Sequence, residues 1–349
     1  MHFRNLTFLA AAAGVVSLLP GQAIAQSLNA KPAKTATQTW TVPRTADGKP
    51  DLQGVWANNT ATPLERPKIL AGREFLTEQE VAALKAKAAE LFKDGNSDAA
   101  FGDSVFESVL ENVKGTKSGF KSVDGGTGDY SSVWTVERDW DNRTSLITDP
   151  PDGRLPPMTP EAQKQQASIS FIGRPAAGPE DRSLSERCIT YGSPQMTAGY
   201  QSYRQIVQTP NSVAMVTEMI HDSRVIPLNG GPHLPSNIQT WMGDPRGHWE
   251  GDTLVVDSTN FKPGAFRAYS TEKLHVIERF TRSSPDILQW EITIDDPGAW
   301  TKPWTAKIPL RSAKKAIYEC ACHEGNYGLA DILAGARRED AAAEANHPK

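Results

Sequence analysis

The stretch HVIERFTRSSPDILQWEITID, His275 to Asp295, holds two runs rich in β-branched and aromatic residues on either side of a short polar segment. Runs of this kind predict two antiparallel strands joined by a tight loop. Short β-rich runs divided by turns extend over residues 201–323, and the two-residue turn at Gly251 predicts that Trp249 lies opposite Leu254. Sequential strands with tight turns predict a mainly β fold, an antiparallel meander that closes into a barrel or a curled sheet.

A four-residue loop over Ser283–Asp286 would set the register of the quoted hairpin. It places Thr281 opposite Leu288 and Glu278 directly opposite Glu291. Like charges in this position destabilise a sheet unless a cation bridges them or one carboxyl stays protonated. In one interpretation both glutamates face water beside a Lys or Arg. In the other they face the interior and form a proton-transfer site.

The N-terminus has the pattern of a Sec-type signal peptide. Arg4 supplies positive charge, an apolar run covers Leu6–Leu19, and small residues stand at Ala23 and Ala25. This run is too short and wrongly flanked for a membrane span, and no second apolar run is long enough to cross a bilayer. We therefore expect cleavage after Ala25 and a periplasmic or secreted protein, in a compartment where thiols oxidise.

The rest of the chain is expected to form one β-rich domain with additions. The capping box Thr77-x-x-Glu80 begins the clearest helix. The Gly-, Pro-, Ser- and Asp-rich stretch after it contains a strand candidate, SSVWTVER, and a short helix from Thr159 to Ala167. The predicted organisation is a signal peptide over 1–25, a flexible lead-in over 26–41, and a single domain over 42–345 that comprises a helix over 77–94, an irregular insertion over 96–200, the β-meander over 201–323 and a C-terminal helix over 327–345.

Composition and missing motifs exclude several classes of function. A formal net charge of -4 argues against nucleic-acid binding, which requires a basic face to neutralise phosphates. The chain has no Gly-x-Ser-x-Gly elbow, phosphate-binding glycine loop or dinucleotide fingerprint. We therefore expect no organic cofactor and a small molecule as the partner, while the oligomeric state stays open.

Resemblances to two groups of known proteins narrow the expected fold and function of this chain. The segments PRTADGKPDLQGVW, HLPSNIQTWMGDPRGHWEGDTLVVDSTNF and ACHEGNYGLADIL resemble a large group of mostly uncharacterised secreted bacterial proteins. That resemblance implies one exported domain and no particular chemistry. The Gly54-Val55-Trp56 triplet on the first strand, together with the meander, resembles the lipocalin or calycin type of barrel. This second resemblance implies a tryptophan that closes one end and a cavity for a small, mostly apolar ligand.

The three cysteines favour a disulfide over a metal site. Cys320 and Cys322 are two apart in what reads as the last strand, AIYECACH, so their side chains share a face and suit no mutual bond. We expect a Cys188–Cys322 bond, with Cys320 buried and free. Zinc would require further ligands, and His323 points to the opposite face if the strand continues. The metal site is therefore the less favoured interpretation.

The motif EMIHDSR places Glu218, His221, Asp222 and Arg224 at a strand end before a turn. A histidine between two carboxylates has the composition of a general acid/base pair, because one carboxylate can orient the imidazole. The alternative is a solvated rim on which Arg224 pairs with Asp222. The two interpretations remain equally open.

The loop GGPHLPSNIQTW carries His233 and Trp241 where a lid over a barrel mouth would lie. His233 could join His221 and Glu218 as metal ligands, although no short ligand spacing is present. We expect His233, Trp241, Arg267 and Tyr327 to contact the ligand.

Two functions from different classes follow from these residues. The first is an exported enzyme without cofactor, of lyase, isomerase or hydrolase type, that transfers protons on an apolar or aromatic substrate in the barrel cavity. Its expected catalytic residues are His221, Asp222, Glu218, Glu278 and Glu291. The second is a periplasmic carrier that binds such a ligand unchanged. Inward-facing titratable groups without partners would favour the enzyme, and a mainly apolar lining would favour the carrier.

Overall fold

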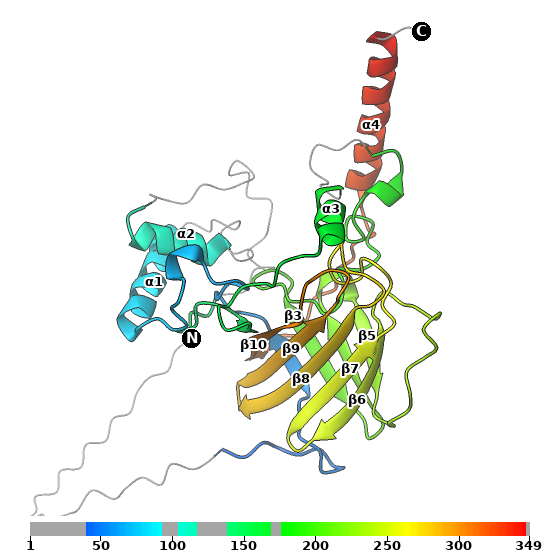
Figure 1. Cartoon of the computed structure of the whole chain (residues 1–349). Helices are drawn as coiled ribbons and strands as arrows, with labels where there is room; N and C mark the ends of the chain where they lie inside the picture. Colours follow the sequence, from blue (N-terminus) through cyan, green and yellow to red (C-terminus); the bar gives the residue numbers. More distant parts are fainter. Residues whose placement is uncertain (1–39, 93–103, 117–137, 169–175, 347–349) are drawn as a thin grey trace, which may run out of the picture. The chain divides into compact units, whose positions relative to one another are not determined.

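The computed structural model describes residues 40–92, 104–116, 138–168 and 176–346. The predicted signal peptide, nearly all of the lead-in and most of the SSVWTVER segment lie outside these residues. The described part of the chain is mainly β, as predicted from the meander (Figure 1). No helix within it is long and apolar enough to cross a membrane.

An antiparallel sheet of ten strands organises the fold. Its hydrogen-bonded order is β5-β4-β3-β1-β10-β9-β8-β7-β6, and β2 pairs with β10 beside this path. Both predicted hairpins are present within this order, which follows the chain from β6 to β10. The strand bounds are β1 Gly54–Ala57, β2 Ile147–Asp149, β3 Tyr203–Gln208, β4 Ser212–Thr217, β5 Ser223–Pro227, β6 Asp244–Glu250, β7 Thr253–Thr259, β8 His275–Ser284, β9 Ile287–Asp295 and β10 Trp304–Ala313.

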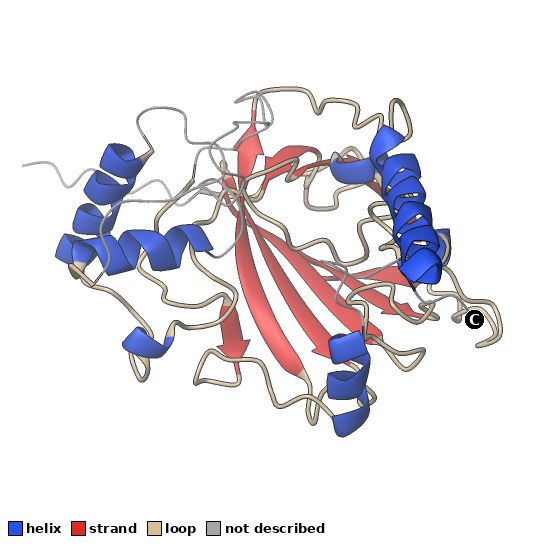
Figure 2. Cartoon of the chain, turned by 90° about the horizontal axis from the view of Figure 1, so that it is seen from above, coloured by secondary structure: helices blue, strands red, loops and turns tan. Residues whose placement is uncertain are grey.

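The sheet curls but does not close, because no ladder joins its edge strands β5 and β6 (Figure 2). Side-chain packing brings these edges together instead. A Cβ added to Gly247 on β6 would lie 2.8 Å from Ile226 Cγ2 and 2.7 Å from Leu228 Cδ2, on and just after β5. Glycine therefore allows two apolar side chains of one edge to lie directly against the backbone of the other.

The predicted register was right for one hairpin and wrong for the other. Trp249 pairs with Leu254, as the two-residue turn at Gly251 requires. In the β8–β9 hairpin, Glu278 pairs with Ile292 rather than with Glu291. An irregularity between Arg282 and Ser284 shifts the pairing by one residue. The predicted register was wrong because it assumed a regular four-residue loop.

This shift places the two glutamates on opposite faces, because a one-residue slip exchanges the faces of a strand. Glu278 points into the sheet interior and is fully buried. Glu291 lies on the outer face, where its carboxylate is 4.0 Å from Lys307 Nζ. The predicted pair of facing glutamates therefore does not exist.

Large side chains fill the interior of the sheet. Phe280 and Trp290 are fully buried, with their rings nearly parallel and their centroids 5.8 Å apart. Trp56 on β1 is buried toward the end of the sheet where the β8–β9 turn lies, and its Nε1 donates to Leu52 O at 2.9 Å. The Arg282 guanidinium lies 5.3 Å from the Trp56 ring centroid at this end.

Four helices lie outside the sheet in the described residues: α1 Glu78–Leu91, α2 Ser104–Val113, α3 Pro160–Ser168 and α4 Tyr327–Asn346. The Thr77 capping box, the short helix after Thr159 and the C-terminal helix confirm the predictions. Helix α2 was missed, since the stretch 96–200 was predicted to be irregular around it; it packs with α1 into a second apolar cluster. The AIYECACH segment is not a strand, because the last strand ends at Ala313.

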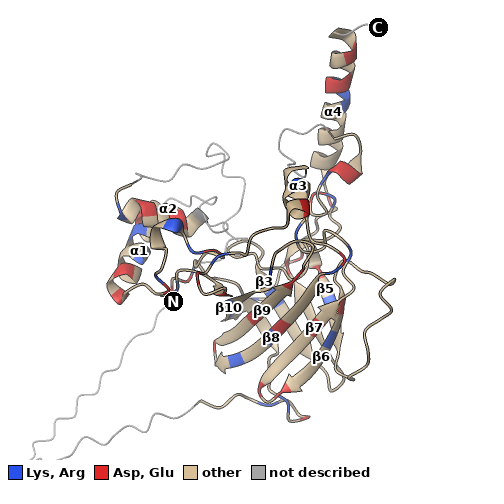
Figure 3. Cartoon of the chain, in the orientation of Figure 1, with Lys and Arg blue, Asp and Glu red and all other residues tan. Residues whose placement is uncertain are grey.

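Charged residues of both signs are interspersed over the helices and strands (Figure 3). The formal net charge of the full chain is -4.

We expect Gly247→Ala to destabilise the protein, because its Cβ would overlap Ile226 and Leu228 at the unclosed edge. Overpacking of this kind costs about 1–3 kcal/mol. Urea unfolding measures the change. Gly335→Ala, in α4 with no atom near its added Cβ, is the matched control and should leave stability unchanged or raise it slightly. Equal effects of the two substitutions would show that the edges do not pack as described.

Candidate functional site

A cleft of about 870 Å³ lies among loops that connect strands of the sheet. The turn between β4 and β5, the loop between β7 and β8 and the segment after β10 all contribute to it. Its wall is largely apolar, with a few polar side chains at defined positions. The lining residues are Thr62, Leu64, Leu146, Ser185, Tyr191, Pro194, Gln195, Met196, Thr197, Ala198, Tyr200, Gln201, Met219, Ile220, Phe266, Arg267, Cys320 and Cys322.

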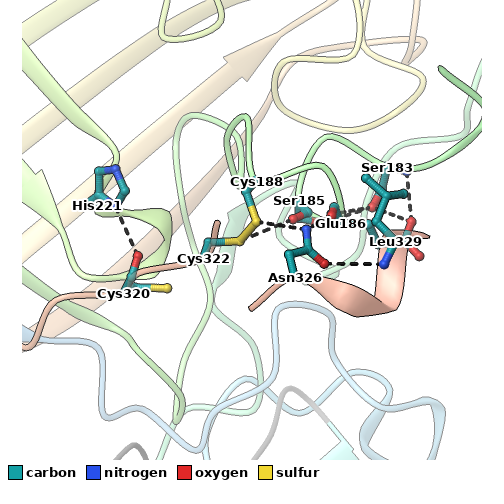
Figure 4. Close-up of a disulfide and its surroundings, with 9 residues drawn as sticks. All are labelled: Ser183, Ser185, Glu186, Cys188, His221, Cys320, Cys322, Asn326 and Leu329. Atoms are coloured by element: carbon teal, nitrogen blue, oxygen red, sulfur yellow. Dashed lines mark hydrogen bonds between the residues drawn. A yellow bond between two sulfur atoms is a disulfide. The ribbon is translucent and has the colours of Figure 1, made fainter. Parts of the chain in front are cut away.

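A disulfide joins two segments of this wall, as the sequence predicted. Cys188 and Cys322 are bonded with a Cα–Cα distance of 5.6 Å, and Cys320 is free (Figure 4). Asn326 Nδ2 donates to Glu186 O at 3.0 Å beside the bond. Cys320 is only partly buried, because its segment turns rather than running as a buried strand, with Cys322 N donating to Cys320 O at 2.8 Å.

Two polar atoms in the cleft wall are buried without a hydrogen-bond partner in the described residues. They are Gln195 Nε2 and Thr197 Oγ1. The Gln195 residue is only 8% exposed, so its side-chain amide has little contact with water. Buried polar groups are nearly always hydrogen-bonded, so each of these two atoms requires an explanation, and a bound ligand is one that fits a cleft. Arg267, a predicted ligand contact, also lines this cleft; its guanidinium lies 5.5 Å from the Phe266 ring centroid.

The residues of the EMIHDSR motif do not form the predicted acid/base pair. His221 is exposed, and its Nδ1 lies 3.1 Å from Cys320 O instead of a carboxylate (Figure 4). Glu218 accepts a hydrogen bond from Tyr318 N at 3.1 Å. Asp222 accepts from the backbone of Tyr191 at 2.8 Å rather than pairing with Arg224. Both carboxylates therefore hold loop backbone in place at the rim of the cleft.

Burial raises the pKa of Glu218, opposed by its backbone hydrogen bonds from Tyr318 and Tyr203. Burial also raises the pKa of Asp222. Between these carboxylates, Ile220 and His221 have φ values of 56° and 46°. A β-branched residue in this region is a backbone outlier that costs about 1–3 kcal/mol. The turn that presents Ile220 to the cleft is therefore held in shape by its surroundings.

Glu278 forms a buried ion pair with Arg224, which neither interpretation of the motif had included. Arg224 donates from both terminal nitrogens to the two carboxylate oxygens, at 2.7 Å for Nη2 to Oε1. Trp290 Nε1 donates to Glu278 Oε1 at 2.9 Å. Both oxygens of this carboxylate are therefore engaged, by two charge-assisted hydrogen bonds from Arg224 and one from the Trp290 indole.

The predicted ligand contact His233 belongs to a different place, the outer face of the sheet. Its Nδ1 lies 3.0 Å from Asp244 and its Nε2 lies 3.1 Å from Asp257, which also contacts His275 Nε2 at 2.9 Å. These contacts fasten the loop between β5 and β6 to β6, β7 and β8. No group of three or more His, Cys, Asp or Glu side chains in the described residues is arranged to hold a metal ion.

The other two predicted ligand contacts lie elsewhere as well. Trp241 packs against the core, with Lys262 Nζ 5.0 Å from its ring centroid. Tyr327 is 77% exposed at the first residue of α4. Of the four predicted contacts, Arg267 alone lines the cleft.

Sequence reasoning missed Gln195 and Thr197, which stand in the YGSPQMTAGY segment. Nothing in their spacing marks them, because their burial results from the way this loop covers the end of the sheet. A further residue that was missed, Arg204, follows directly after this segment and is 4% exposed. An arginine at an inward position of a β-rich run was the available signal.

No protein-family model and no curated protein matches the chain. Among solved structures, the crystal structure of the fluorescent protein UnaG N57A mutant matches with 11% sequence identity and a TM-score of 0.21. The match covers 32% of this chain and 72% of that chain. A TM-score this low supports no inference about function, so the class of protein is given by the fold alone: a mainly β protein built on an unclosed antiparallel sheet.

We expect Glu218→Gln to stabilise the protein at pH 7 and to have little effect near pH 4. A raised pKa means that the folded state holds the proton more tightly than the unfolded chain does, so this stabilisation is lost as pH rises through the folded value. Glutamine keeps the shape and removes the charge. Melting temperatures measured from pH 4 to pH 8 test this, with exposed Glu319→Gln as the control. A variant less stable than the parent protein at pH 7 would contradict it.

We expect Glu278→Gln to lower the free energy of unfolding by about 3–5 kcal/mol, because it leaves the buried Arg224 without its counter-charge. Glu291→Gln, on the outer face of the same hairpin, should change it little. Adding Arg224→Met to Glu278→Gln should restore part of the loss, since the double variant no longer buries that unpaired charge. Urea unfolding of the four proteins measures this; equal losses for the two glutamate variants would refute the assigned register.

Proposed function

We propose that this protein binds a small, mostly apolar molecule that carries a hydrogen-bond acceptor, and that the cleft lined by Gln195 and Thr197 is its binding site. The observation that supports this is the pair of buried atoms without partners, Gln195 Nε2 and Thr197 Oγ1. Leaving such groups unsatisfied costs about 1–3 kcal/mol each, and a ligand acceptor would remove that cost.

The size and chemistry of the cleft agree with this proposal. Its volume of about 870 Å³ lies within the usual range of small-molecule sites. Leu64, Leu146, Met196, Met219 and Phe266 provide apolar contact around the polar atoms. Methionine side chains adapt to different shapes, so the wall suits a ligand with an irregular apolar body.

Binding is better supported than proton transfer, which makes the carrier the preferred function over the lyase, isomerase or hydrolase. Glu278 is held by Arg224, Glu291 lies outside, and His221 contacts a carbonyl. These three residues are therefore not arranged as the acid/base pair that was predicted for the cleft. We further propose export to the periplasm or beyond, with which the Cys188–Cys322 disulfide is consistent.

The test is a fluorescence titration with the neutral apolar probe N-phenyl-1-naphthylamine. Ala198→Trp fills the cleft with a bulky ring and should weaken probe binding by about tenfold or more, as expected when roughly 1.4 kcal/mol is lost. Ala342→Trp, the same substitution on the exposed face of α4, should bind like the parent protein. Absence of probe binding, or equal binding by all three proteins, would overturn the proposal.

A further inference from the structure

Arg204 is a buried cation in the sheet interior directly beneath the cleft wall. It is 4% exposed, and its guanidinium carbon lies 4.2 Å from the Trp290 ring centroid. Nη2 donates to the backbone oxygen of Gln195 at 2.9 Å, while Nε has no hydrogen-bond partner in the described residues. The side chain is thus only partly satisfied in a place that water does not reach.

No carboxylate balances this charge. Glu278 is the acidic group that acts on Arg204, but both of its oxygens are already engaged by Arg224 and one also accepts from Trp290. Among the described residues, Arg204 forms no ion pair within 4.0 Å. In the local cluster of Arg204, Arg224 and Glu278, two guanidinium groups therefore share one carboxylate, which leaves one positive charge in excess.

The excess charge is costly for the protein in the absence of a ligand. Burial lowers the pKa of Arg204 to about 9, Arg224 lowers it as well, and Glu278 opposes both effects. The guanidinium is still charged at neutral pH. A buried cation without a counter-charge is strongly unfavourable unless something supplies the missing anion.

Gln195 connects this cation to the cleft. Its backbone oxygen accepts from Arg204. Gln195 is also one of the residues that line the cleft, and its Nε2 is buried without a partner in the described residues. An anion that accepted from Gln195 Nε2 would therefore bind to the same residue whose backbone oxygen accepts from the unbalanced guanidinium.

We propose that the ligand is a monoanion, a carboxylate on an apolar body, whose anionic group binds at Gln195 over Arg204. This rests on the proposed binding function and specifies its ligand class. A single negative charge matches the single excess positive charge, and the apolar wall accommodates the rest of the molecule. The exposed Arg267 at the same cleft adds a positive field at its entrance.

The experiment compares dodecanoate with dodecanol, which share a chain and differ in charge, as competitors that displace N-phenyl-1-naphthylamine at pH 7.5. Dodecanoate should bind the parent protein about tenfold more tightly, the expected effect of a charge-assisted contact. Arg204→Met should remove this preference. It should weaken the binding of dodecanoate about tenfold, while the affinity for dodecanol should change by no more than about twofold. Arg279→Met, which removes an outward arginine of β8, should keep the preference.

A stability readout separates this role from a structural one. Arg204→Met should melt at the same or a higher temperature, because it removes an unbalanced buried charge. Gln195→Glu should also melt at the same or a higher temperature. It should weaken the binding of dodecanoate about tenfold, because the new carboxylate would take the place of the ligand's carboxylate. This second variant tests the idea even if Arg204→Met does not fold.

The outcomes distinguish the two proposals. If neither the probe nor dodecanol binds, the proposed binding function fails and the ligand class fails with it. If both bind but dodecanoate has no advantage, or if Arg204→Met weakens the two competitors equally, the binding function stands and the anionic site is refuted. Loss of the dodecanoate preference in both variants, with dodecanol unaffected by Arg204→Met, supports the site.

Discussion

The ion pair between Glu278 and Arg224 is the interaction on which the curled sheet depends. Arg224 comes from β5 at one edge, and Glu278 comes from β8, close to the other edge in the hydrogen-bonded order. Strands so far apart in a sheet can meet only if the sheet curls around its interior. The pair therefore spans the interior between the two halves of an unclosed sheet, while Gly247 allows the edges to pack outside it.

Stability alone does not account for the charges in this interior. A buried ion pair can often be replaced by apolar side chains of similar volume without loss, because desolvation offsets most of the attraction. Here a third charge, that of Arg204, is buried beside the pair without any carboxylate of its own. A purely structural core would gain from an apolar residue at this position. The arginine is understandable if the interior serves the cleft above it, where the missing charge can be supplied by a bound molecule.

The parts of the fold that could be predicted are those set by local chemistry. The Thr77 capping box and the two-residue turn at Gly251 allow little choice. The Cys188–Cys322 bond was predicted correctly from the odd number of cysteines and the expected compartment, although the strand assumed for Cys320 and Cys322 does not exist. The register around Glu278 could not be predicted, because its bulge serves a contact with a residue 54 positions away. The cleft could not be predicted from the sequence for the same reason. Gln195 stands in an ordinary loop sequence, and only the folded sheet places an arginine beneath it.

The disulfide gives the cleft a dependence on oxidation that the sheet does not share. The sheet is held by ladders and by the Glu278–Arg224 pair, neither of which involves a thiol. The cleft wall combines segments far apart in sequence, and the bond between Cys188 and Cys322 closes a chain separation of 134 residues. In the chain-entropy description, closing a loop of this length stabilises by about 5 kcal/mol. If the protein is exported as proposed, the sheet can form without the bond, whereas the arrangement of loops that buries Gln195 is completed in the oxidising compartment where a ligand would be met.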